Sequence, residues 1–583
     1  MKTTIQLILV CMAPFAYAFG QQTTPAVQKE VPAADIYDIQ DRILIKTKGG
    51  QQLSAIVVRK KEWKAPQATA LFFTIYADHE KNLAEAKRSA DRGYVGVVAN
   101  SRGKALSPDQ INPYETEAED VNGVIDWISK QGWSDGRVAM YGGSYSGFAA
   151  WAATKHLHPA LKTIIPYVAA IPGFGLPMEN NIFLNANYGW GFYVSNHKYL
   201  DTTNYYNQKH WRDMQFNWYH SGLPYRKIDS IEGRPNPLLQ RWIQHPAYDR
   251  YWQNMVPWKE DFAKINIPVL SITGYYDDGQ ISALRYFKEH YKYHKNADHY
   301  LIIGPYDHFG AQRGGSPVLR DYKVDPVSLI NTAQITYEWM DYVLKGGPKP
   351  ALLKDKINYQ VMGANEWKHA PSIDKMSNQV QRLYLTDLKS GENQLLLPGK
   401  PVKAGFSLQE VDFADRNHTN NDYYPYPIVR KELDRSTGLY FISSPFEEEL
   451  SVDGIFSGVL KAEINKKDMD VGLVLYELTP DGQYFHLSYF LGRASYAQDI
   501  TRRTLLKAGA INTIPFSSTR MFSRRLSKGS RLLVVLDINK NPFAQINYGT
   551  GKEVSEESIA DAKVPLKIKW STDSYVDIPV WKY

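Results

Sequence analysis

The chain has 583 residues, which is more than a single hydrophobic core holds, so we expect roughly two to four domains. Hydrophobic residues make up 43% and charged residues 22%, which is the balance of an ordinary globular protein rather than a disordered or fibrous one. The formal charge of +7 is spread thinly and forms no Lys/Arg block of the kind that follows a phosphate backbone. This distribution argues against nucleic acid as a partner.

Residues 1–20 have the features of a secretory signal peptide. Lys2 precedes an apolar run that ends in small residues near Gly20 and is too short for a durable membrane span. We therefore predict a secreted or periplasmic protein, and no other apolar run is long enough to cross a bilayer. The one cysteine, Cys11, follows Val10 rather than a small residue, which disfavours lipid attachment. A mature chain without cysteine has no disulfides, thiolate metal sites or cysteine nucleophiles.

The chain from 35 to 174 alternates strand and helix patterns. Short apolar runs are separated by segments whose apolar residues recur at helical spacing. Such alternation predicts a mostly parallel α/β sheet. The predicted strands are 53–60, 68–76, 93–100 and 138–141, and the predicted helices are 80–93, 115–131 and one that starts at Gly147.

Residues 175–262 interrupt this alternation. They are dense in Asn, Tyr, Trp and His and show no strand pattern, whereas sheet-type runs resume at 267–274 and 299–305. A polar, aromatic insert between two parts of one sheet is typical of a lid. We therefore predict a helical cap inserted between 35–174 and 263–350, with a separate helical domain as the alternative.

From 355 to 583 the pattern is that of β structure alone. Apolar or alternating runs such as INYQVMG (357–363) and VGLVLYELT (471–479) lie between turn residues, and no long helix pattern intervenes. These runs predict a C-terminal β-sandwich in the form of a jelly roll. No sequence repeat of about 20–50 residues emerges, which argues against propellers and solenoids.

The stretch GRVAMYGGSYSGFAAWAA (136–153) predicts a nucleophile elbow. A short apolar strand meets two glycines, then Ser144, then a helix of small residues. A sharp strand-to-helix turn exposes the hydroxyl of such a serine, and Gly142 and Gly147 remove side chains where strand and helix nearly touch. A glycine-rich loop without catalysis is the alternative.

Two later strands end beside the side chains that this chemistry needs. A serine hydroxyl requires a base to remove its proton, and the base requires a third group to orient it. VLSITGYYDDG (269–279) presents Asp277 and Asp278 after one strand, and YLIIGPYDHFG (300–310) presents His308 after the next. In α/β-hydrolase sheets the nucleophile, the acid and the histidine follow one another in this order.

The run DWISKQGWSDGRVAMYGGSYSG, together with LFFTIYAD, NSRG, GYYDDG, GPYDHFG and YQVMGANEW, resembles the X-prolyl dipeptidyl aminopeptidase and cocaine esterase (CocE/NonD) family of serine hydrolases. This family includes the α-amino-acid ester hydrolases. The resemblance covers nearly the whole mature chain and implies an α/β-hydrolase domain, an inserted helical cap and a C-terminal jelly roll. It places the family's nucleophile at Ser144, its acid at Asp277 rather than Asp278, and its base at His308.

The resemblance also implies an oxyanion hole formed by the backbone N–H of Tyr145 and the hydroxyl of Tyr76. A phenol aimed at a developing alkoxide stabilises the transition state more than the ground state. A tyrosine that only packs in a loop is the alternative for Tyr76. No metal ion and no organic cofactor is implied.

Three carboxylates are candidates for binding a substrate ammonium: Glu179, Asp78 and Asp278. Dipeptidyl-peptidases and α-amino-acid ester hydrolases hold such an ammonium, for which buried carboxylates are the natural counter-charge. In the ester hydrolases two acidic residues lie two and three places after the catalytic aspartate, where this chain has Gly279 and Gln280. Glu179 lies roughly where a third acid of that cluster falls. A solvated or structural carboxylate is the alternative for each of the three.

The predicted function is hydrolysis of a small ester, amide or peptide through an acyl-enzyme on Ser144, of the acyl or α-amino-acid ester hydrolase type. An X-Pro dipeptidyl-peptidase that releases N-terminal dipeptides is the alternative. A non-catalytic protein that binds glycans or peptides is a remote alternative, because the nucleophile, base and acid are all present in the expected order.

Overall fold

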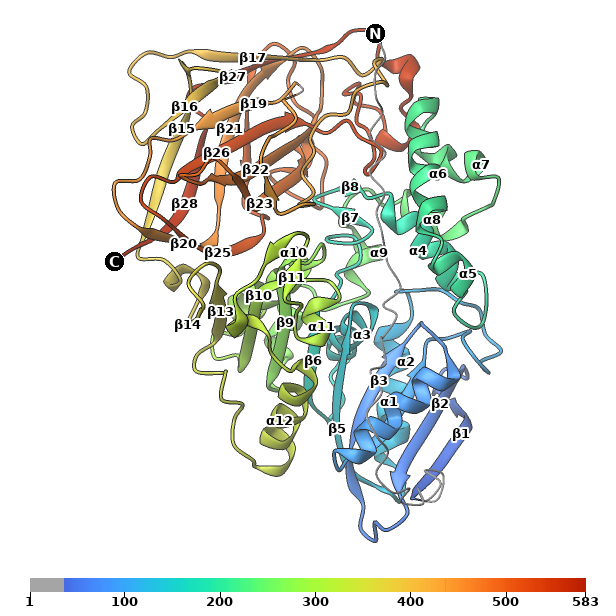
Figure 1. Ribbon diagram of the computed structural model, residues 1–583. Helices are drawn as coiled ribbons and strands as arrows, with labels where there is room; N and C mark the ends of the chain where they lie inside the picture. The colour runs from blue at the N-terminus through green and yellow to red at the C-terminus, as the bar shows by residue number, and fades with distance from the viewer. Residues whose placement is uncertain (1–35, 436) are drawn as a thin grey trace, which may run out of the picture.

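The computed structural model describes residues 36–435 and 437–583, so the predicted signal peptide lies outside the described residues. Figure 1 shows three parts: an α/β region coloured blue to yellow-green, a helical region in teal and green beside it, and a β-rich region in yellow to red. In the described residues, none of the helices combines the length and the apolar character that crossing a bilayer requires.

One ten-stranded sheet forms the core of the α/β part. Its strand order is β1-β2-β4-β3-β5-β6-β9-β10-β13-β14, and the strands from β4 to β13 in this order are parallel. The strands are β1 (Tyr37–Lys46), β2 (Gln52–Lys60), β3 (Gln67–Thr74), β4 (Val95–Asn100), β5 (Ser134–Gly143), β6 (Leu161–Tyr167), β9 (Val269–Tyr276), β10 (His299–Asp307), β13 (Ile357–Val361) and β14 (Glu366–Ala370).

Helices cover both faces of this sheet. Along β5, Val138 and Met140 pack on the face covered by α2, α3 and α10, whereas Ala139 and Tyr141 point to the face covered by α1 and α12. Side chains alternate between faces because successive residues of a strand point in opposite directions. The helices are α1 (His79–Asp91), α2 (Glu117–Ser129), α3 (Tyr145–Ala153), α10 (Gln280–Tyr293), α11 (Gly310–Arg313) and α12 (Thr332–Lys345).

The predicted strands and helices of this part are confirmed, and two strands were missed. β1 is a largely exposed edge strand with charged residues, and β6 contains Pro166, a residue that argues against a central strand. One assignment is wrong: the run 357–363 was predicted within the β-sandwich, but β13 pairs with β10 and β14 closes the ten-stranded sheet. A short buried apolar run has the same local pattern in either sheet, so its pairing partner cannot be read from it.

The chain between β6 and β9 forms the helical region, as predicted. It contains the small hairpin of β7 (Met178–Glu179) and β8 (Ile182–Phe183) and six helices. Lys104, which lies in the loop after β4, donates through Nζ to the backbone oxygens of Val194 and His197 at the end of α4 and so fixes this helix to the sheet. The helices are α4 (Ala186–Ser195), α5 (Thr202–Tyr205), α6 (Gln208–Ser221), α7 (Ile228–Glu232), α8 (Pro237–Trp242) and α9 (Arg250–Gln253).

The C-terminal part is built from a connected, largely antiparallel set of strands. Among the described residues beyond α12, helical structure is confined to short 3₁₀ turns, in agreement with the predicted all-β character. The strands are β15 (Gln379–Ser390), β16 (Asn393–Leu397), β17 (Phe406–Val411), β18 (Val429–Arg430), β19 (Leu439–Ile442), β20 (Leu450–Ile455), β21 (Ser457–Ile464), β22 (Asp470–Leu478), β23 (Tyr484–Arg493), β24 (Ile511–Phe516), β25 (Met521–Leu526), β26 (Arg531–Ile538), β27 (Leu566–Ser571) and β28 (Tyr575–Lys582).

Gly147 is the residue that lets α3 lie against the sheet. A Cβ there would lie 2.7 Å from the carbonyl oxygen of Tyr167 at the end of β6, which is a steric clash. We expect Gly147→Ala to lower the free energy of unfolding by about 1–3 kcal/mol, the usual cost of overpacking. Gly132→Ala is the matched control, because nothing lies within 4 Å of a Cβ at that position. Urea denaturation of both variants measures the difference, and equal stabilities would contradict this role for Gly147.

Candidate active site

Ser144 occupies a strained turn between β5 and α3. Its backbone has φ 58° and ψ −117°, a combination that a non-glycine residue adopts only when the surrounding structure enforces it. The Ser144 N–H donates to the Tyr167 carbonyl oxygen at 2.9 Å, and this bond ties the turn to β6. A Cβ on Gly142 would lie 2.5 Å from that of Ser146, so the turn also needs a glycine there. The predicted elbow geometry is therefore present.

Asp277 and His308 meet at the carboxyl ends of two adjacent parallel strands, β9 and β10. The Nδ1–H of His308 donates to Oδ1 of Asp277 at 2.9 Å. The Asp277 carboxylate is fully buried and also accepts from the Thr273 hydroxyl at 2.8 Å and from the Gly279 N–H at 3.1 Å. Three donors, one from β9 and one from each of the loops after β9 and β10, thus fix the carboxylate in the orientation that faces the imidazole.

The electrostatics of this pair favour the imidazolium form. Burial lowers the pKa of His308, but the hydrogen bond and the charge of Asp277 outweigh this effect and raise it to about 9. Gln312 connects the histidine to the elbow: its Nε2 donates to the His308 carbonyl oxygen at 2.9 Å, and its side chain fills the space that a Cβ on Gly143 would take. His308 therefore lies on the side of the sheet that carries Ser144.

Tyr76 follows β3, and its hydroxyl lies beside the side chain of Ser144. Burial raises the pKa of Tyr76 to about 12. The hydrogen bonds with Trp190 and Ser144 act in the opposite direction but have a smaller effect. The Trp190 indole N–H, from α4, donates to the phenol oxygen at 2.9 Å. The phenol oxygen accepts this bond, and the phenol O–H is a donor group beside Ser144.

Tyr145 presents its backbone and its side chain to different surroundings. Its N–H lies in the first turn of α3, where backbone donors have no acceptor within the helix. Its hydroxyl points into the core and donates to the Glu117 carboxylate, and Ser101 Oγ donates to the same phenol at 3.3 Å. Burial raises the pKa of Glu117 to about 7. The sequence analysis missed Glu117, because an acid in the first turn of a helix looks like a helix-dipole partner.

Glu179 does not present a free carboxylate, which argues against its predicted role in binding a substrate ammonium. It is buried and forms a bidentate ion pair with Arg520, with 2.7 Å between Oε1 and Nη1 and 2.9 Å between Oε2 and Nη2. The pairing joins two residues 341 positions apart in the chain, so no local pattern indicates it. The guanidinium binds both oxygens of this carboxylate and neutralises its charge, so Glu179 offers a substrate cation less attraction than a free carboxylate does.

Asp78 and Asp278 differ in their availability. Asp78 caps α1, accepting from the Lys81 N–H at 3.1 Å and pairing with the Lys81 ammonium, so its carboxylate already has partners within the protein. The Asp278 side chain is half exposed, and its Oδ1 lies 3.8 Å from His308 Nδ1. Asp278, Asp277 and His308 place one ligand atom each within 4.8 Å of one another, so a metal ion fits there by spacing alone.

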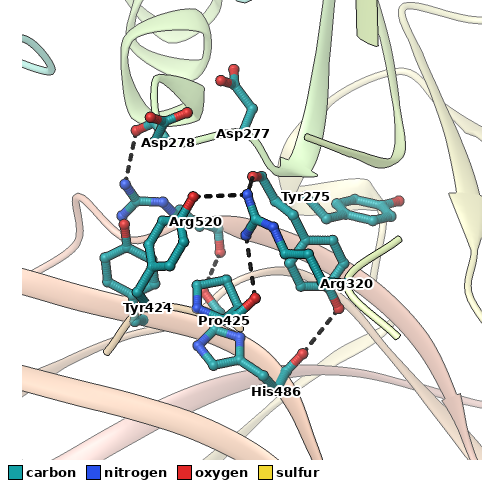
Figure 2. A pocket seen from close by; sticks show the side chains of 11 residues that line it. Tyr275, Asp277, Asp278, Arg320, Tyr424, Pro425, His486 and Arg520 are labelled. Atoms are coloured by element: carbon teal, nitrogen blue, oxygen red, sulfur yellow. Dashed lines mark hydrogen bonds between the residues drawn. The ribbon is translucent and has the colours of Figure 1, made fainter. Parts of the chain in front are cut away.

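Figure 2 shows the pocket beside these residues, with Asp277 and Asp278 above two arginines. Arg320 lies in the turn between β11 (Val318–Leu319) and β12 (Tyr322–Lys323) and donates to the Tyr276 carbonyl oxygen at 3.2 Å and to the Tyr424 hydroxyl at 2.9 Å. The sequence analysis singled out neither Arg320 nor Arg520, because both are remote in sequence from the motifs they contact.

Comparison with known proteins matches this arrangement to one family. The profile of the X-Pro dipeptidyl-peptidase (S15 family) matches residues 26–310, and that of the X-Pro dipeptidyl-peptidase C-terminal non-catalytic domain matches residues 353–567. The chain belongs to this family of serine hydrolases, which holds esterases and peptidases. The cocaine esterase of Rhodococcus sp. (strain MB1 Bresler) is 24% identical over 516 residues, which cover 80% of this chain and 84% of the esterase.

Two solved structures share the fold of this chain over nearly its whole length. An aminopeptidase from a marine sediment archaeon (Thaumarchaeota archaeon) superposes with a TM-score of 0.80 at 18% identity, covering 97% of this chain and all of its own. An α-amino acid ester hydrolase superposes with a TM-score of 0.75 at 20% identity, covering 96% of this chain and 98% of its own. Both likenesses show the fold.

The pairing of His308 with Asp277 can be tested by titration. We expect Asp277→Asn to lower the pKa of His308 from about 9 to below its ordinary value of 6.5, because burial then acts without the opposing carboxylate. NMR titration of the His308 ring protons measures the change. Asp278→Asn is the matched control and should lower the pKa less, since its carboxylate lies 3.8 Å away and is half exposed. An equal or larger effect of the control would contradict the pairing.

Proposed function

We propose that this family member is a carboxylic ester hydrolase that works through an acyl-enzyme on Ser144. The observation that carries the proposal is the convergence at one sheet edge of the strained Ser144 turn, the His308–Asp277 hydrogen bond and the Tyr76 phenol. In its neutral form, which dominates above its pKa of about 9, His308 takes the Ser144 proton as Oγ attacks the carbonyl carbon and then gives it to the leaving alcohol. Water, deprotonated by the same imidazole, releases the acid and regenerates the serine.

Asp277 and Tyr76 support two different charges in this reaction. Asp277 holds Nδ1–H of His308 and stabilises the imidazolium that forms when the serine loses its proton. The Tyr76 hydroxyl and the Tyr145 N–H donate to the oxyanion of the tetrahedral intermediate, and a donor of this kind typically contributes about 2.7–4 kcal/mol to lowering the barrier. The Trp190 indole N–H donates to the Tyr76 phenol oxygen and so helps to hold the phenol in place beside Ser144.

The charges around the site favour an ester substrate without an obligatory ammonium. The buried acid that would anchor an ammonium, Glu179, is neutralised by Arg520, and Gly279 and Gln280 bring no further charge. X-Pro dipeptidyl-peptidase activity is the second candidate, favoured by the half-exposed Asp278 carboxylate beside His308. That carboxylate is accessible to a free N-terminus of a peptide.

We further propose that residues 1–20 are a signal peptide and that the protein works as a secreted or periplasmic enzyme on small ester, amide or peptide substrates, without nucleic acid, a membrane span or a metal cofactor. The supporting observations are the apolar N-terminal run and the thin spread of charge. The C-terminal β part is proposed to be the jelly roll of the family, on the basis of its antiparallel strands.

A fluorophosphonate probe tests the nucleophile. We expect the probe to label the enzyme at Ser144 and to block hydrolysis of aryl esters, because the activated hydroxyl attacks phosphorus as it attacks a carbonyl carbon. Ser144→Ala should abolish both labelling and hydrolysis, and the adjacent Ser146→Ala should leave labelling intact. Ester hydrolysis that persists in Ser144→Ala would contradict the proposed mechanism. Loss of activity on treatment with EDTA would favour a metal ion at the Asp277–Asp278–His308 group instead.

N-acylation separates the two candidate functions. We expect aryl esters of an amino acid and of its N-acetyl derivative to be hydrolysed with kcat/KM values of the same order, because Arg520 already neutralises the buried carboxylate of Glu179. Losing a charge pair that an enzyme buries typically costs at least about 2 kcal/mol, or roughly 30-fold in kcat/KM. A loss of that size on N-acetylation, together with cleavage of X-Pro anilides, would establish the peptidase instead.

A further inference from the structure

The loop that carries Asp277 is held on both sides by arginines. The carbonyl oxygen of Tyr276, just before Asp277, accepts from Arg320 at 3.2 Å. The carbonyl oxygen of Asp278, just after it, accepts from Arg520 Nη2 at 2.9 Å. Figure 2 shows both guanidinium groups below the loop. The backbone on either side of the proposed catalytic acid is therefore fixed by long side chains from other parts of the chain.

Arg520 reaches this loop from the C-terminal β part. It directly precedes β25, and its guanidinium lies 3.7 Å from the centre of the Tyr489 ring, which supports its plane. Glu179, in β7 at the start of the helical region, fixes the two Nη atoms through the bidentate pair. Both side chains are almost completely buried, with 3% and 1% of their side-chain surfaces exposed. Three parts of the fold thus meet in one hydrogen-bonded unit beside Asp277.

A second contact joins the same loop to the same strand. The Met521 N–H donates to Gln280 Oε1 at 2.6 Å, and Gln280 Nε2 donates back to the Met521 carbonyl oxygen at 3.1 Å. Gln280 Nε2 also donates to the Gly274 carbonyl oxygen at 2.8 Å, which closes the loop on itself. The amide of Gln280 suits this position because it both donates and accepts, which a carboxylate does not.

We propose that Arg520, oriented by Glu179, is a positioning residue through which the C-terminal β part sets the orientation of Asp277 toward His308. The inference rests on the proposed function in one respect, the role of Asp277 as the acid that orients the base. The family profile describes the C-terminal domain as non-catalytic, and Arg520 touches neither substrate nor reacting atoms. Its effect reaches the chemistry through the backbone of the acid loop.

This role predicts a loss in the chemical step rather than in substrate affinity. A buried ion pair adds little net stability compared with apolar residues, but removing one partner leaves an uncompensated charge. Removing both partners avoids that cost and frees the Asp278 carbonyl oxygen from its donor. Small misplacements of catalytic groups cost up to about 100-fold in rate. The acid loop can then drift without the fold being lost.

The test uses the double variant Glu179→Gln/Arg520→Gln in the full-length enzyme. We expect kcat for an aryl ester to fall by about 10–100-fold with KM nearly unchanged. The acidic limb of the kcat/KM profile should move to lower pH, because a displaced Asp277 no longer raises the pKa of His308.

The matched control is Asp470→Asn/Arg493→Gln. This pair is equally bidentate, with 2.8 and 2.9 Å contacts, and equally buried, but it joins β22 to β23 within the C-terminal part. Its removal should change thermal stability while leaving kcat and the pH profile at wild-type values. A similar fall in kcat in the control would overturn the proposal, and so would wild-type kcat with an unchanged pH profile in the Glu179/Arg520 variant.

Arg520→Lys keeps the proposal testable if the double variant does not fold. A lysine retains the charge opposite Glu179 but cannot bind both carboxylate oxygens and the Asp278 carbonyl oxygen with one planar group. We expect a smaller fall in kcat with the same unchanged KM, and wild-type kcat with a wild-type pH profile would overturn the proposal. These outcomes are distinct from failure of the proposed function, which would show as ester hydrolysis in Ser144→Ala.

Discussion

The hydrogen bond between His308 and Asp277 is the interaction on which the rest of the site depends. It exists because β9 and β10 are adjacent parallel strands, so the loops after them emerge at the same sheet edge. The elbow reaches that edge through β5 and β6, and Tyr76 reaches it through β3. The parallel strands β3, β5, β9 and β10 therefore each place one functional group at the same edge of the sheet, directly after the strand ends.

A site that binds a cation needs an unpaired negative charge, whereas the buried carboxylate of Glu179, beside the acid loop, is paired with an arginine. Glu179 is the buried acid at the start of the helical region, and its partner is supplied by the chain itself in Arg520. The same guanidinium binds the backbone of the acid loop. One guanidinium thus binds both the buried carboxylate of Glu179 and the backbone beside Asp277.

Sequence patterns predicted the parts of the site that local chemistry dictates. Ser144 sits between glycines that a sharp turn demands, and Asp277 and His308 each follow a buried apolar run. The contacts of Glu179, Glu117 and Arg320 could not be predicted, since each partner comes from a distant segment and an isolated charged residue looks alike in solvent or in a core. The pairing of β13 with β10 in the ten-stranded sheet could not be predicted either, because strand pairing depends on residues far apart in the sequence.

The indole of Trp190 makes the competence of the oxyanion hole depend on where the helical region lies. Its helix, α4, is fastened to the sheet by the buried ammonium of Lys104 at its far end. Were α4 to lift away, the phenol of Tyr76 would lose its rear donor and become free to turn its proton elsewhere. A displaced α4 would therefore weaken the oxyanion hole and slow the reaction at Ser144, even with His308 and Asp277 in place.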